Sequence, residues 1–254
     1  MTSTDAPRRL VVLATAVVCL ITSCGDSAPA GMVVPDRRAT SYVAAHTKAD
    51  LNAVSTIGVA RTVVELLPNH LFEILDGNYA ANTQSVLVGT PTAIQPEQAL
   101  WWPDRDVNDG GDPKSVPFGE PAAMSRTWLV TLSVDRSIAG PSPVELLPAA
   151  STDELVTVRI QSDGGPIDVD RYRQGLLGLG RSVWFLTAYA DGPKDAFGIA
   201  WFGGAVARVT NEGNLEFSLL SPDVRRSVEG APIGLDDLVK AAQDPVVRIP
   251  RDGG

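Results

Sequence analysis

The sequence contains only two cysteines, Cys19 and Cys24, and both lie in its first tenth. Because no cysteine follows Cys24, the body of the chain has neither a disulfide framework nor a cysteine-based zinc site. The two cysteines are therefore expected to serve the N-terminus and not the fold.

Histidine is equally scarce, since His46 and His70 are the only two and lie 24 residues apart. Neither has the companion ligands in short, recurring spacings that a zinc site needs. No serine lies in a G-x-S-x-G elbow, and no G-x-x-x-x-G-K-[ST] phosphate loop occurs. The sequence therefore predicts no cofactor and no bound metal, and it favours a non-catalytic protein.

Basic residues are the minority charge, with 21 Lys and Arg against 30 Asp and Glu, a formal net charge of −9. Phosphate backbones are bound by basic surfaces, so nucleic acid is excluded as a partner. Binding to anionic lipid by charge is disfavoured for the same reason.

The N-terminus carries the clearest pattern. Arg8 and Arg9 precede an unbroken apolar run from Leu10 to Ile21. As a helix this run would span about 18 Å, well short of the ~30 Å hydrocarbon core. It predicts the apolar part of a secretory signal peptide; the alternative, a buried core helix, fits the basic flank and terminal position less well.

The end of that run, Ile21-Thr22-Ser23-Cys24, resembles the lipobox of bacterial lipoproteins. The resemblance implies that Ile21, Thr22 and Ser23 are recognised by the signal peptidase. It also implies that Cys24 receives a diacylglycerol and becomes the new N-terminus, whereas Cys19 is removed. At roughly 0.8 kcal/mol for each buried CH₂, two acyl chains such as palmitate anchor a protein stably. The expected location is the outer face of the cell membrane, after export by a route that stays open.

Composition adds to this resemblance. The chain is rich in Ala, Val, Gly, Pro, Asp and Arg and poor in Lys, as in a high-GC bacterium. Together with the lipobox, it resembles an actinobacterial envelope lipoprotein.

The chain divides into five expected segments. These are a signal peptide (1–23), the lipidated cysteine with a flexible tether (24–40), an N-terminal helical segment (41–79), a β domain (80–217), and a C-terminal helix and tail (218–254). In the helical segment, apolar residues recur every three or four positions. The pattern breaks near Pro68, after which Asn69 is expected to cap a short helix ending at Gly77.

The β domain shows a period of two, which is typical of strands. Trp128, Val130, Leu132 and Val134 alternate with polar residues, and similar runs cover 84–94, 154–162 and 181–190. Residues 196–220 predict two or three short strands, with turns at Gly203-Gly204 and Glu212-Gly213. Residues 95–124 are expected to be irregular, and 234–244 to form a short helix. The fold class is mainly β with flanking helices (α+β), as a small five- to seven-stranded antiparallel barrel.

The order "VLVGTPTAI", "TWLVTLSVDRSIAG", "LVTVRI", a Gly-rich connector "GGPIDVDRYRQGLLGLG" and "RSVWFLTAY" resembles OB-fold modules of the netrin and metalloproteinase-inhibitor type. The resemblance covers roughly residues 80–217 and implies an OB-like barrel. Those inhibitors act through a free N-terminal cysteine locked by disulfides. Here Cys24 would be acylated and has no disulfide partner, so no inhibitor residue is carried over.

Two neighbouring stretches are candidates for binding. Asp104, Asp106 and Asn108 alternate as in a calcium loop, but the glycine and glutamate that such a loop needs are out of register. We interpret this stretch as an acidic, solvated loop. Trp101 and Trp102 form a candidate binding surface, since paired aromatics are enriched at interfaces; alternatively, they cap the open end of the barrel.

These patterns predict a lipid-anchored protein. Its β domain is expected to be a non-catalytic binding module for another component of the envelope, such as an envelope protein. An alternative is an envelope hydrolase that uses carboxylates such as Asp168, Asp170 and Asp191. A third possibility is a purely structural lipoprotein.

The anchor can be tested directly. We expect Cys24→Ala to release the protein from membranes or to leave an uncleaved precursor, because the thiol is the only acylation point after cleavage. Membrane fractionation and intact-mass spectrometry check this. Unchanged mass and unchanged partitioning would contradict the anchor.

Overall fold

The computed structural model describes residues 37–47, 63–68, 71–74, 77–80, 83–103, 112–188, 194–200, 205–220 and 233–243. All of them belong to the compact unit Val33–Gly254. The signal peptide, the lipobox residues and residues 24–36 of the expected tether lie outside the described residues, whereas residues 37–40 of that tether belong to a helix. No helix in the described part is both long and apolar enough to cross a membrane.

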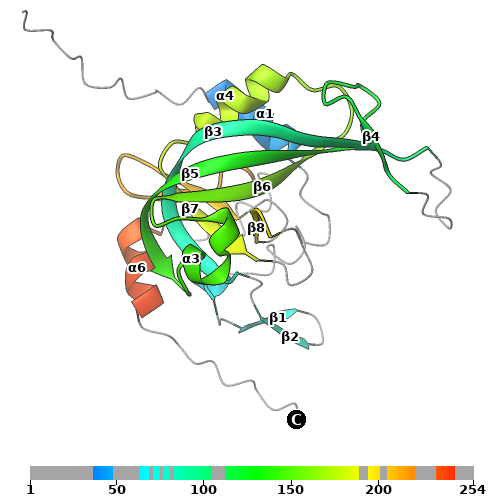
Figure 1. The fold of residues 1–254 in the computed structure, drawn as a ribbon. Coiled ribbons are helices and arrows are strands. Elements are labelled where there is room, and N and C mark those ends of the chain that lie inside the picture. Colours follow the sequence, from blue (N-terminus) through cyan, green and yellow to red (C-terminus); the bar gives the residue numbers. More distant parts are fainter. Residues whose placement is uncertain are drawn as a thin grey trace, which may run out of the picture. The chain divides into compact units, whose positions relative to one another are not determined.

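Eight strands form one mixed sheet (Figure 1). They are β3 (Ser85–Trp101), β4 (Lys114–Val116), β5 (Ser125–Ala139), β6 (Leu155–Asp163), β7 (Ser182–Thr187), β8 (Phe197–Ile199), β9 (Val206–Val209) and β10 (Leu215–Glu216). Their order is β10-β9-β7-β8-β6-β5-β3-β4, and β7 pairs in addition with β3. The pairings β3–β5–β6–β8–β7 therefore return to β3. The expected α+β, mainly β class is confirmed.

One pairing departs from the predicted pattern. β6 and β8 run parallel, with Val158 opposite Phe197, whereas the other strand pairs are antiparallel. The expectation of a wholly antiparallel arrangement of five to seven strands is wrong on both counts. A parallel neighbour requires a long crossover, and the chain between β6 and β7 supplies part of it.

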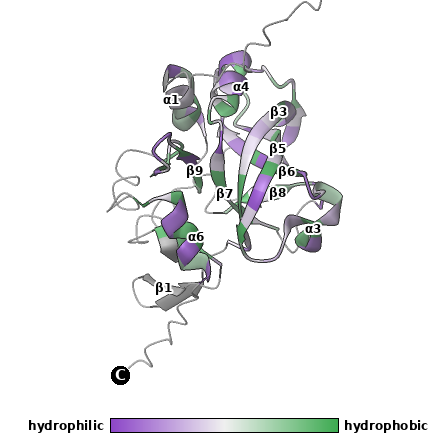
Figure 2. Ribbon diagram, turned by 90° about the vertical axis from the view of Figure 1, so that its left-hand side faces the viewer, coloured by the Kyte–Doolittle hydropathy of each residue, from purple (hydrophilic) through white to green (hydrophobic). Residues whose placement is uncertain are grey.

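The period-two pattern produces the buried face of the sheet. Trp128, Val130 and Leu132 of β5 lie opposite Ile160, Val158 and Val156 of β6, and all six side chains are buried. Hydrophilic and hydrophobic residues alternate along these strands in Figure 2. Successive side chains of a strand point to opposite faces of the sheet. The alternation of apolar and polar residues therefore fixes the register, because a shift by one residue would expose the apolar side chains.

β3 is much longer than its sequence pattern predicts. It continues through Gln95 to Trp101, so the expectation of an irregular stretch from residue 95 is wrong. Pro91 and Pro96 obscure the pattern because proline donates no ladder hydrogen bond. Both lie at register shifts in the pairing with β5. On the other edge of β3, no described strand pairs with residues 90–98.

The remaining elements are short. They are α1 (Arg37–His46), η1 (Val63–Leu66), β1 (Leu71–Ile74), β2 (Gly77–Ala80), α3 (Pro143–Leu146), η2 (Pro148–Ala150), α4 (Val169–Leu177) and α6 (Leu235–Gln243). The predicted C-terminal helix is confirmed as α6, which buries Leu235 and Leu238. The predicted helix between Asn69 and Gly77 is wrong.

In its place β1 and β2 form a hairpin that pairs Ile74 with Gly77. Two residues therefore separate the strands. Helical spacing is a weak signal in so short a segment, and the pairing of the two strands decides its structure.

Helix α4 lies within the glycine-rich connector, where the pattern gave no element. Asp168 caps it by accepting a hydrogen bond from the Arg171 amide at 3.0 Å. α1 lies beside α4 (Figure 1). The close approach depends on Gly175, where a Cβ would stand 2.4 Å from both the Ala39 oxygen and a Val43 methyl.

An aromatic stack joins these helices to the sheet. The ring of Trp128 stacks on Tyr172 of α4 with centroids 4.6 Å apart, and Phe118 meets it edge-on at 4.6 Å. The Tyr172 hydroxyl lies 3.1 Å from the Thr47 hydroxyl after α1. Burial raises the pKa of Tyr172, so this hydroxyl stays protonated.

We expect Gly175→Ala to destabilise the protein by about 1–3 kcal/mol, because the added methyl cannot fit between α1 and α4. Helix propensity alone predicts the opposite sign, a gain of about 1 kcal/mol. Denaturant unfolding measures the difference. Gly119→Ala is the matched control, since a Cβ there meets nothing within 4 Å. Equal effects of the two substitutions would contradict the packing argument.

Candidate functional site

The two adjacent tryptophans at the end of β3 border a groove of about 520 Å³. We call it the tryptophan groove. Its lining residues are Trp101, Trp102, Pro121, Ala122, Ala123, Met124, Gly164 and Gly165. They come from three places in the chain: the end of β3, the segment before β5 and the turn after β6. The sequence-predicted pair Trp101 and Trp102 is thus brought to one site.

Backbone hydrogen bonds hold the three segments together. The Met124 amide donates to the Leu100 carbonyl, and the Gly165 amide donates to the Ala123 carbonyl, each at 2.7 Å. A Cβ on Gly164 would stand 2.5 Å from the Ala123 oxygen, so only glycine permits this approach. Gly165 has a φ of 85°, which is the left-handed region.

Arg126 of β5 connects two of the segments that line the tryptophan groove. Its side chain is fully buried and donates to three backbone carbonyls: Phe118 at 2.8 Å, Glu120 at 2.7 Å and Asp163 at 3.2 Å. Burial lowers the pKa of Arg126, since a low-dielectric setting disfavours its charge. One guanidinium therefore ties the loop before β5 to the end of β6.

The lining of the groove contains no charged side chain. Trp101 and Trp102 are both half-buried, and the Trp102 amide lies 3.5 Å from the Met124 sulfur. Lys114 faces Trp101 across the β3–β4 pair, with its ammonium 6.0 Å from the ring centroid. The groove thus offers indole rings, a thioether and small apolar groups, which suits an uncharged surface of a ligand.

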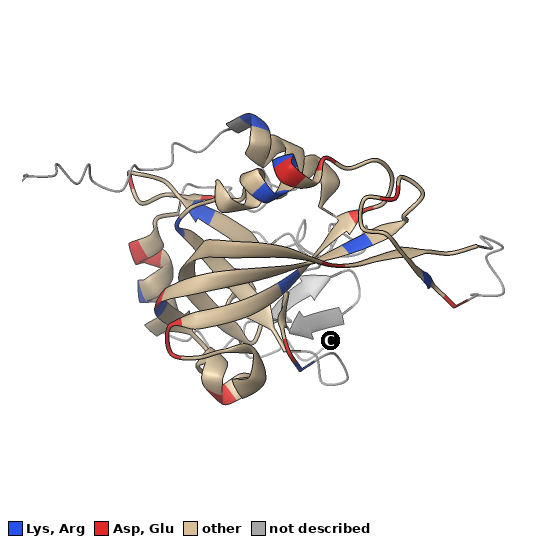
Figure 3. Cartoon of the chain, turned by 45° about the horizontal axis from the view of Figure 1, so that its top comes forward, with Lys and Arg blue, Asp and Glu red and all other residues tan. Residues whose placement is uncertain are grey.

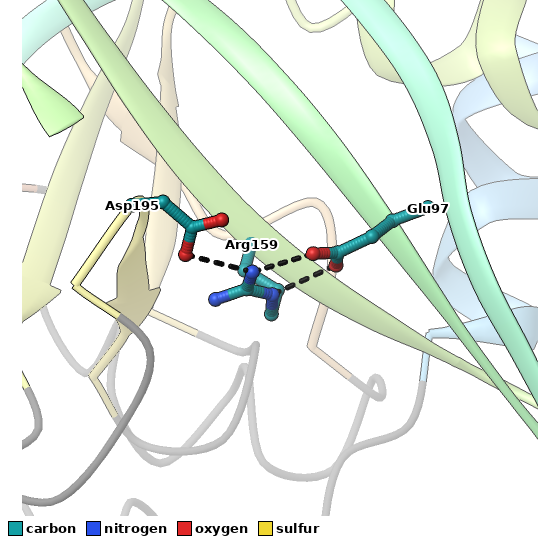
Figure 4. A network of polar contacts seen from close by, with 3 residues as sticks. All are labelled: Glu97, Arg159 and Asp195. Atoms are coloured by element: carbon teal, nitrogen blue, oxygen red, sulfur yellow. Dashed lines mark hydrogen bonds and ion pairs between the residues drawn. The ribbon is translucent and has the colours of Figure 1, made fainter.

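A separate cluster links β3, β6 and the turn before β8 through Arg159 (Figure 4). Its guanidinium binds Glu97 through two contacts of 2.7 and 2.5 Å, and Asp195 at 3.1 Å. Glu97 falls at a register shift of β3, which directs its side chain across β5. Hydrogen bonding to Glu97 raises the pKa of Arg159. Both carboxylates are committed to this ion-pair network.

Two of the three carboxylates that the sequence offered for a hydrolase, Asp168 and Asp170, make structural contacts. Asp168 caps α4, and Asp170 pairs with Arg173 on the same helix at 2.9 Å. Asp191 lies outside the described residues. Lys and Arg are interspersed with Asp and Glu over the elements drawn in Figure 3. The described residues contain no cluster of three or more potential metal ligands.

The remaining candidates are placed as follows. Asp104, Asp106, Asn108 and His70, together with Ile21, Thr22, Ser23 and Cys24, lie outside the described residues. His46 stacks on Tyr42 at 4.0 Å, and its Nδ1 lies 2.8 Å from the Tyr42 carbonyl oxygen. This histidine is part of the packing of α1.

A second groove, of about 560 Å³, lies between the turn at residues 210–213 and the start of α6. It contains the ion pair of Asp135 with Arg181, at 2.9 Å. A hydrogen bond from Thr210 lowers the pKa of Glu212 at its rim. The Asp237 carboxylate accepts from the Gly234 amide at 3.1 Å and so caps α6. The charged groups of Asp135, Arg181, Glu212 and Asp237 in this groove are thus used in structural contacts.

Arg126 is the residue that sequence analysis missed. A signal was present, because Arg126 shares the parity of Trp128, Val130 and Leu132, the buried positions of β5. An arginine at such a position must find buried acceptors.

Comparison with protein-family models, with curated proteins and with solved structures found no match to this chain.

We expect Arg126→Met to destabilise the protein by about 1–3 kcal/mol, because three carbonyls lose a charged donor. The tryptophan emission should also change, since the loop before β5, which borders the groove, loses its hydrogen bonds to the Arg126 side chain. Denaturant unfolding and fluorescence spectra measure the two effects. Arg136→Met serves as the control, because Arg136 is exposed on the same strand. A variant as stable as this control, with an unchanged spectrum, would contradict the role assigned to Arg126.

Proposed function

We propose that the chain is a lipid-anchored envelope protein whose β domain binds an envelope partner through the tryptophan groove. The anchor rests on the lipobox resemblance around Cys24. The binding role rests on the groove, and the observation that carries it is the position of two adjacent, half-buried tryptophans in an uncharged lining that includes Gly164 and Gly165.

The proposed architecture is an OB-like barrel. It is supported by the closed series of pairings from β3 through β5, β6, β8 and β7 back to β3. The parallel β6–β8 pair and the position of α4 between β6 and β7 support it as well. In such barrels ligands bind near the loop between the first two strands. Here that loop joins β3 to β5 and carries part of the tryptophan groove.

Physical chemistry favours the groove as the contact surface. Aromatic side chains bury a large area at low conformational cost and dominate the energetics of interfaces. Because Arg126 and the backbone hydrogen bonds fix the surrounding segments, a partner would meet a surface that is already formed. Uncharged lining residues leave a polyanion without counter-charges.

The contacts of the acidic residues weigh against the hydrolase alternative. Glu97, Asp195, Asp168 and Asp170 are each engaged by an arginine or a helix amide. A general acid–base pair needs carboxylates that face a shared cleft with unlike surroundings. None of these four meets that requirement.

Crosslinking mass spectrometry on intact cells tests the proposal. We expect reproducible crosslinks from the β domain to one envelope protein, reduced about tenfold by Trp101→Ala or Trp102→Ala. Leu155→Ala is the matched control, since Leu155 is an exposed apolar side chain outside the groove. Equal crosslinking by all three variants would overturn the role of the groove.

A further inference from the structure

Two buried tryptophans of the sheet have different surroundings. The Trp128 indole N–H on β5 donates to the Ser162 hydroxyl on β6 at 3.0 Å. The Trp184 indole N–H on β7 is as deeply buried, yet it has no hydrogen-bond partner among the described residues. The Ser85 hydroxyl on β3 is also fully buried and likewise has no hydrogen-bond partner among the described residues.

Strand register places these two orphaned groups near each other. Leu87 of β3 lies opposite Trp184, and Ser85 lies opposite Leu186. Ser85 and Leu87 point to the same face because they are two residues apart, so Ser85 and Trp184 are diagonal neighbours on one face. Diagonal neighbours lie about 7–8 Å apart, within reach of an aromatic side chain.

The face they share is part of the buried core. A Cβ on Gly89, two residues beyond Leu87, would stand 3.2 Å from a Leu87 methyl and 3.5 Å from the Leu132 Cβ. Leu87 and Leu132 are both fully buried. Bulk solvent therefore does not reach this face, and its polar atoms need partners inside the protein.

Buried polar atoms are almost always hydrogen-bonded, and a buried water commonly bridges those that cannot meet directly. We propose that this site binds one water molecule between Trp184 and Ser85. The indole N–H donates to the water oxygen, and the water donates to the Ser85 hydroxyl oxygen. Trp184 and Ser85 supply two partners, which is within the two to four that such a water needs. The Thr83 hydroxyl, two residues before Ser85, is also buried without a hydrogen-bond partner in the described part of the chain.

This water would join β3 to β7, the pair that closes the series of strands. Its role at that pair matches the direct Trp128–Ser162 bond at the β5–β6 pair. The inference is independent of any partner bound at the tryptophan groove.

A double-mutant cycle of Trp184→Phe and Ser85→Ala tests the proposal. If a water bridges the two groups, Ser85→Ala destabilises the protein, and the two substitutions are coupled by about fivefold in the unfolding constant. If the groups have no bridge, removal of the orphaned hydroxyl is neutral or stabilising and the effects are additive. The second result would overturn the proposal.

The cycle of Trp128→Phe and Ser162→Ala is the matched control, because that pair is bonded directly. Trp184→Phe also removes volume from the core, and the cycle cancels the stability change that this causes. If the variant does not fold, nuclear magnetic resonance of the wild-type chain, labelled with ¹⁵N at the indoles, tests the water site instead. A cross-peak from the Trp184 indole proton to a long-lived water is expected, and its absence alongside a folded spectrum would refute the site.

Discussion

The architecture depends on β3 forming hydrogen bonds along both of its edges. Residues 86–89 pair with β7 on one side and with β5 on the other, which requires the strand to coil strongly. Four register shifts against β5 supply that coiling, because each extra residue bends the strand and increases its twist. Gly89 allows β3 to approach β5 closely, since a Cβ there would stand 2.9 Å from the Ser133 oxygen. Without the pairing of β3 with β7, the strands β7 and β9 would be joined to β5 and β6 only through the three-residue strand β8.

Regular alternation made the central strands predictable. The runs around Trp128 and Val158 have apolar residues at every second position, and the α6 segment has its acidic first turn. Prediction failed where a local signal was interrupted or ambiguous. Pro96 interrupts the strand pattern of β3, and the glycines of the connector mask α4 although Asp168 is a standard cap. In β1 a run of four apolar and acidic residues suits a helix or a strand equally, and the pairing with β2 decides between them.

The candidate site was predictable only in its side chains. Trp101 and Trp102 could be singled out because adjacent indoles are rare. The rest of the groove is made by backbone contacts between segments about 40 residues apart, such as the hydrogen bond from Gly165 to Ala123. Carbonyl groups have no sequence signature, so the three acceptors of Arg126 could not be foreseen. The resulting rigidity implies that a ligand pays little to order this surface on binding.

The two prolines of β3 have a consequence for how copies of the protein meet. An open strand edge is a template on which a second chain can add a strand. Pro91 and Pro96 lie within the part of β3 that no described strand pairs with on its second edge. Neither can donate an amide hydrogen, and the bulges beside them distort the spacing of those that can. The same irregularity that makes this strand hard to recognise in the sequence therefore disfavours its edge-to-edge pairing with another copy of the chain.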